Sequence, residues 1–187
     1  MNTAPTSPIF ARAEKAVTAL THGLTLLSGA LLIAAVLLTC ISIVGRSLTS
    51  FGLAALPGDY ELVEMLCGLA VFAFMPHCQL HKGHVSVDLF VSALGHQAMA
   101  WTQLLGDIVI TGLVGLLAWR HALGTFDKYN YAETSFILEI PTWWPYAVAL
   151  LLLILFALTS LFTIWRDIRD LSIASRDQAV EHEGYQP

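Results

Sequence analysis

The chain has 187 residues, of which 56% are hydrophobic and 12% are charged, and its formal net charge is −5. A soluble domain carries about 25% charged residues, so this composition excludes an ordinary soluble protein. The few basic residues form no cluster that would predict a nucleic-acid-binding surface. We therefore expect an all-α integral membrane protein.

Four long apolar runs predict four membrane-spanning helices, because a helix needs about 20 apolar residues to cross the bilayer core. The third span contains an acid, Asp107. We take the apolar stretches on either side of it as one span, because the stretch that follows it is too short to span alone. The expected membrane domain covers 16–168, between an N-terminal segment 1–15 and a polar tail 169–187. The expected spans are at about 20–45, 61–81, 97–119 and 143–165.

The first span has basic residues before it, Arg12 and Lys15, as a secretory signal peptide does. Its apolar run, Ala16 to Gly45, is much longer than the about 7 to 15 residues of a signal peptide. We therefore expect an uncleaved membrane anchor.

The connections contain residues that end helices. Gly83 is expected to end the second helix, and Val85 to Leu94 then reads as a possible short helix in the interface between spans two and three. Arg120 to Thr142 is expected to be the longest loop. From Ser172 onward the tail is polar, and we expect it to be loose, that is, without regular secondary structure.

The distribution of Lys and Arg predicts the orientation. With four spans, both termini share a side with the loop between spans two and three. That side holds six basic residues against three on the other, so both termini are expected in the cytoplasm. The six are Arg12, Lys15, Lys82, Arg166, Arg169 and Arg176, and the three are Arg46, Arg120 and Lys128.

Acids open the second span on the same side as the cation that closes the first. Asp59, Glu61 and Glu64 follow Arg46 across the first loop, and Glu61 and Glu64 share a helical face. An unpaired charge at a membrane helix is costly. We expect at least one of these acids to pair with Arg46.

His77, His81 and His84 follow one another at helical spacing, with Asp88 one turn further on. Such spacing suits a metal or haem site, but Gly83 interrupts the face and no matching histidines lie in another span. No nucleophile–base pair or phosphate-binding loop is present in the sequence. We expect a protein that is not an enzyme and has no catalytic, cofactor-binding or metal-binding residues.

Asp107 lies inside the third span, and a carboxylate there suggests a functional site. Transport sites in membranes use several such groups and interrupted helices. We therefore favour pairing or partner contact for Asp107 over ion transport.

The sequence resembles the small, Q-type membrane subunit of tripartite ATP-independent periplasmic (TRAP) transporters over about Ala16 to Trp165. The order of the matching elements carries the resemblance: Val44-Gly45-Arg46, Asp59-Tyr60-Glu61-Leu62-Val63-Glu64, His84-Val85-Ser86-Val87-Asp88 and Leu138-Glu139-Ile140-Pro141-Thr142-Trp143. The family often has Trp before a Glu-Glu pair where this chain has Asp59-Tyr60-Glu61.

This resemblance implies a scaffold subunit in the bacterial inner membrane. Its expected partners are membrane lipid, a large permease subunit with the solute and sodium sites, and a periplasmic protein that delivers an organic-acid-type solute. The candidates for charge pairing or partner contact are Arg46, Asp59, Glu61, Glu64, His84, Asp88 and Asp107. The alternatives are a membrane cytochrome or metal subunit using the three histidines, and an adaptor without a transport role.

Overall fold

The structure is a computed structural model that describes residues 8–48, 54, 56–81 and 96–183. It contains four helices, each with a stretch long and apolar enough to cross a membrane, which confirms the predicted all-α membrane fold. The helices are α1 (Pro8–Ser47), α2 (Asp59–Leu80), α4 (His96–Asn130) and α5 (Trp143–Glu183). The possible interfacial helix at 85–94 lies outside the described residues.

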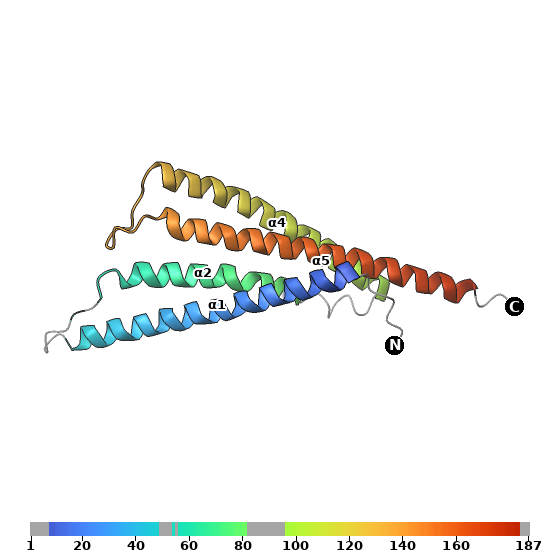
Figure 1. The fold of residues 1–187 in the computed structure, drawn as a ribbon, viewed down its shortest axis with the longest axis horizontal. Helices are drawn as coiled ribbons and strands as arrows, with labels where there is room; N and C mark the ends of the chain where they lie inside the picture. The colour runs from blue at the N-terminus through green and yellow to red at the C-terminus, as the bar shows by residue number, and fades with distance from the viewer. Residues whose placement is uncertain (1–7, 49–53, 55, 82–95, 184–187) are drawn as a thin grey trace.

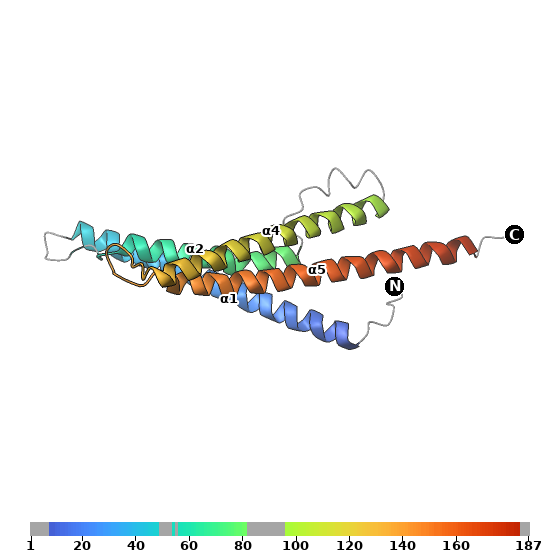
Figure 2. The same ribbon diagram turned by 90° about the horizontal axis from the view of Figure 1, so that it is seen from above.

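The helices lie side by side in the order α1, α2, α5, α4 (Figure 1). We call the two ends of the molecule the Arg46 end and the Arg12 end, after two residues near the ends of α1. At the Arg46 end the helices form a single layer, and they fan apart at the Arg12 end (Figure 2). Two helical hairpins, α1–α2 and α4–α5, therefore meet along one seam between α2 and α5.

Small apolar clusters hold the layer together. Leu24, Ala73 and Leu152 join α1, α2 and α5, and a second cluster around Phe156 joins α4 to α5. At the Arg12 end Phe10 stacks on Phe162 of α5, with ring centroids 5.9 Å apart. Most of the remaining large apolar side chains are exposed, as expected where lipid takes the place of a protein core.

Two helices extend further than the sequence predicted. The expected loop from Arg120 begins as helix, because α4 continues to Asn130, and the one glycine in that stretch, Gly124, is tolerated within a helix at a modest cost. The tail that we expected to be loose from Ser172 is helical as far as Glu183. Neither Gly nor Pro occurs between Ser172 and Gly184, so no residue type interrupts α5 there.

The second helix ends earlier than expected. Its last residue is Leu80, three residues before the predicted stop at Gly83. His81 has left the helical conformation, with φ −92° and ψ 10°, while its N–H still bonds to the carbonyl oxygen of His77 at 3.2 Å. A terminal turn of this kind satisfies carbonyl groups that have no partner within the helix.

The outer helix α1 is longer than a bilayer core requires. Its 40 residues give a length of about 60 Å, against about 30 Å of hydrocarbon. The 41 residues of α5 give a similar length. Both helices must therefore tilt strongly or extend beyond the hydrocarbon, and α5 projects past the other helices at the Arg12 end (Figure 1).

Candidate functional site

Asp59 connects the end of α1 to the start of α2. Its carboxylate accepts a hydrogen bond from the Ser42 hydroxyl and another from the Tyr60 N–H at 2.9 Å. A carboxylate in the first turn of a helix is favoured by the helix dipole, so Asp59 stabilises both the start of α2 and its junction with α1.

Glu61 binds the loop between α4 and α5. One carboxylate oxygen accepts the Ile137 N–H at 2.8 Å, and the other accepts the Leu138 N–H at 3.1 Å. Hydrogen bonds to an ionised acceptor are stronger than neutral ones. This acid therefore ties the α4–α5 hairpin to α2 at the Arg46 end.

Gly58 allows the loop to approach this closely. It precedes α2 in the left-handed conformation, with φ 76°, which glycine adopts without steric cost. A Cβ at this position would collide with the Leu138 side chain. The glycine is thus required both for its backbone conformation and for the contact between loop and helix.

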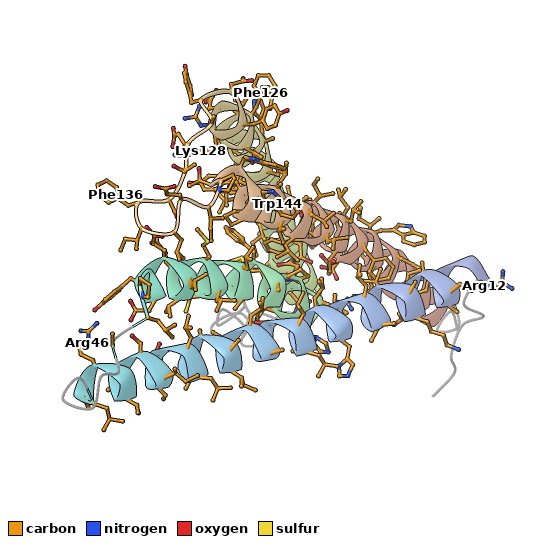
Figure 3. All side chains as sticks on the ribbon, turned by 60° about the vertical axis from the view of Figure 1, so that its left-hand side comes forward. Arg12, Arg46, Phe126, Lys128, Phe136 and Trp144 are labelled. Carbon is orange, nitrogen blue, oxygen red and sulfur yellow. The ribbon has the colours of Figure 1, made fainter. Side chains whose placement is uncertain are left out.

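The loop, residues 131–142, has its own internal bonds. The Ser135 N–H donates to the Ile140 carbonyl at 2.9 Å, and the Thr142 N–H donates to the Glu133 carbonyl at 2.9 Å. Glu133 also pairs with Lys128 at the end of α4. The loop is therefore a fixed element, and it presents Phe136 with its side chain fully exposed (Figure 3).

The sequence-predicted acids are thus gathered at one end. Asp59 and Glu61 are bonded to Ser42 and to the loop, and Glu64 is exposed one turn further along α2. Arg46 lies at the same end of the molecule, opposite Arg12 (Figure 3). A direct ion pair between Arg46 and one of these acids stays a prediction.

Asp107 is buried where three helices meet. Its side chain is 3% exposed and that of Gln79 is 1% exposed. The Gln79 amide donates to one Asp107 oxygen at 3.0 Å and lies 3.4 Å from the Thr163 hydroxyl. Since these residues belong to α2, α4 and α5, we call them the polar junction.

The seam has a further polar contact beside this junction. The Arg166 guanidinium of α5 donates to the Leu80 carbonyl at 3.2 Å, which satisfies one of the carbonyl groups that the end of α2 leaves open. The bond is partly buried, which reduces competition by water for the donor. The α2–α5 seam is therefore fixed by polar groups toward the Arg12 end as well.

Sequence reasoning singled out Asp107 but missed Gln79 and Thr163. Gln79 carried a usable signal, because an amide inside an otherwise apolar run requires a buried partner. Thr163 carried little signal, because threonine in a membrane helix commonly bonds to its own backbone. Thr163 does so here by donating to the Ser160 carbonyl at 2.8 Å.

The histidine array is described only in part. The rings of His77 and His81 lie 4.2 Å apart, and His81 Nδ1 lies 3.0 Å from the His77 carbonyl oxygen. His84 and Asp88 lie outside the described residues. Within the part of the chain that is described, no group of three metal-ligating side chains is arranged to hold an ion.

Replacing Glu61 with Gln should release the loop. The amide would retain one acceptor oxygen and place an NH₂ group against the second backbone donor. We expect the amide hydrogens of Ile137 and Leu138 to exchange about tenfold faster, a factor typical of losing one charge-assisted bond. Hydrogen-exchange mass spectrometry of the loop measures this.

The matched control for that experiment is Glu139→Gln, which removes an exposed carboxylate from the loop itself. It should leave the exchange of both amides unchanged. Equal exchange in the wild type and in Glu61→Gln would show that the carboxylate does not hold the loop.

Replacing Gln79 with Leu should weaken the polar junction. Interhelical hydrogen bonds in membranes are worth about 0.6 to 2 kcal/mol, so we expect a loss of about 1 kcal/mol in the free energy of unfolding. Gln79→Leu and Asp107→Leu should be less than additive when combined, because each removes the same bond. Unfolding in mixed micelles, followed by circular dichroism, measures all three variants.

Thr125→Val serves as the control, since the Thr125 hydroxyl bonds at 2.8 Å to the His121 carbonyl of its own helix. It should change stability by less than Gln79→Leu. Strict additivity of Gln79→Leu and Asp107→Leu would contradict the coupling.

A family model described as "Tripartite ATP-independent periplasmic transporters, DctQ component" matches residues 35–170, which is more than half of the chain. The match spans the acids at the Arg46 end, the loop and the polar junction. No curated protein and no solved structure matches the chain. The chain belongs to the DctQ family, the small membrane component of TRAP transporters.

Proposed function

We propose that this chain is the membrane scaffold of a TRAP transporter. It would support a large permease subunit in sodium-coupled, binding-protein-dependent uptake of an organic-acid-type solute. The family match carries the proposal. The packing supports it, because α2 is bonded to the α4–α5 loop at the Arg46 end and to α4 and α5 toward the Arg12 end, as expected of a part that stays rigid while another moves.

The chemistry of the spans also favours a supporting role. Sites for solutes and coupling ions in membranes are usually built from interrupted helices near the midplane. Here all four helices are continuous over the described residues. Asp107 bonds to Gln79 of a neighbouring helix, so one of its oxygens is already engaged within the chain.

The shape of the layer favours a partner. A single layer of four helices has two broad faces (Figure 2). Many large apolar side chains are exposed, and lipid or another membrane protein must cover them. The large permease subunit is the partner that the family provides. The fixed loop at the Arg46 end would face the periplasm, where the solute-binding protein arrives.

We place both termini in the cytoplasm and the protein in the inner membrane of a bacterium. The six-to-three division of Lys and Arg supports this orientation. The end of α1, the start of α2 and the α4–α5 loop lie at the Arg46 end, and the described ends of α1 and α5 lie at the Arg12 end (Figure 1). That arrangement agrees with four crossings.

Reporter fusions test the orientation. An enzyme that is active only in the periplasm should be active when inserted after Lys128 and inactive when fused after Pro187. A reporter active only in the cytoplasm should give the opposite result. The same side at both positions would rule out four crossings.

Reconstitution tests the scaffold role. Vesicles with the large subunit, the binding protein and this chain should take up solute, and vesicles without this chain should not. Asp107→Asn should change the yield of the complex or the maximal rate while solute preference stays as in the wild type. Full-rate, binding-protein-dependent uptake without the chain would refute the proposal.

A further inference from the structure

A cavity of about 620 Å³ lies under the loop at the Arg46 end, between α2 and the α4–α5 hairpin. Its volume lies within the range of cavities that bind small molecules, about 300 to 1,000 Å³. Its inner wall is mostly apolar and includes Leu69, Phe72 and Ala149, with the His121 ring beside Phe72 and bonded to the Tyr146 carbonyl. Its rim is polar and includes Glu64, Lys128 and Thr142.

The change from polar rim to apolar interior follows the helix axes. Along α2 the lining runs from Glu61 to Phe72, a distance of about 16 Å at 1.5 Å per residue. Half of a bilayer core is about 15 Å thick. The cavity therefore spans the depth of about one leaflet, with its polar rim at the headgroup level that Trp143 and Trp144 of α5 mark.

We propose that this cavity binds one phospholipid whose headgroup carries an ammonium group. An acyl chain would occupy the apolar interior, and the headgroup would lie at the rim. The inference concerns the chain itself and does not depend on its role in transport.

The charges at the rim favour an ammonium over an anionic headgroup. Glu61 is engaged by the loop N–H groups, and Lys128 pairs with Glu133. Glu64 has no hydrogen-bond or ion-pair partner among the described residues. Its carboxylate is thus available to a cation, whereas a purely anionic headgroup would face two carboxylates with the nearest lysine already paired.

The mouth of the cavity is formed in advance. Phe136 lines it from the loop tip although its side chain is fully exposed. Glu61 and the close contact at Gly58 hold that loop in place. A lipid chain in the cavity would contact the otherwise unpacked Phe136 ring, and binding would not require the loop to become ordered first.

A glycine in the cavity wall allows a clean test. Gly68 lines the cavity, and a Cβ added there meets no atom within 4 Å. Gly68→Leu therefore adds a bulky side chain to the cavity wall at a point where its Cβ has room. The control is Gly112→Leu on α4, where the added Cβ also meets nothing within 4 Å but no cavity wall is changed.

The experiment is native mass spectrometry of the full chain, both alone and co-purified with the large permease subunit. Each sample is first incubated with a mixture of phosphatidylethanolamine and phosphatidylglycerol. Wild type and Gly112→Leu should retain one phosphatidylethanolamine. Gly68→Leu should lose both lipids. Glu64→Gln should lower the preference for phosphatidylethanolamine about fivefold, the size of one partly exposed ion pair, and Glu139→Gln should leave it unchanged.

Three results would overturn the proposal. The first is that the wild type retains no lipid. The second is that Gly68→Leu retains as much lipid as the wild type. The third is that Glu64→Gln has the same headgroup preference as the wild type. Lipid that is lost whenever the large subunit is present would show that a segment of the partner fills the cavity instead. Unfolding temperatures of both glycine variants establish that each is folded.

Discussion

The α2–α5 seam is the contact on which the rest of the structure depends, because it is the main contact between the two hairpins. Between membrane helices, apolar contact gains little, since lipid tails are as apolar as leucine. Polar bonds are therefore needed to fix one relative position. Such bonds join α2 to the other hairpin near both ends: Glu61 with the loop N–H groups at one, and Gln79 with Asp107 of α4 and Thr163 of α5 toward the other.

These two attachments differ in chemistry because they lie in different surroundings. Near the headgroups an ionised acid remains accessible to water, and Glu61 can keep its charge while it accepts two backbone donors. Deeper in the layer an amide meets an acid and a hydroxyl, so that the polar atoms of Gln79 and Thr163 share one site. Together they restrain rotation of one hairpin against the other about the seam. The chain would then respond to a moving partner as one body.

The sequence was sufficient for the architecture and insufficient for the bonds that fix it. The lengths of the apolar runs predict four spans, because the bilayer sets a minimum apolar length. The extension of α5 to Glu183 was missed because we gave polarity more weight than the absence of Gly and Pro. The partners of Glu61 were beyond prediction in principle. They are backbone N–H groups 76 and 77 residues further along the chain, and a backbone donor leaves no signature in the sequence.

The placement of the polar residues also constrains how a partner recognises this layer. A protein that replaces lipid on one apolar face gains shape complementarity there but few directional bonds. Specific orientation must then come from the ends of the helices, where Arg46, the acids of α2 and the fixed loop are concentrated. A lipid held under that loop would form part of the same surface. Recognition at the Arg46 end would leave the middle of the layer free to serve as a smooth apolar support, which suits a scaffold beside a subunit that moves.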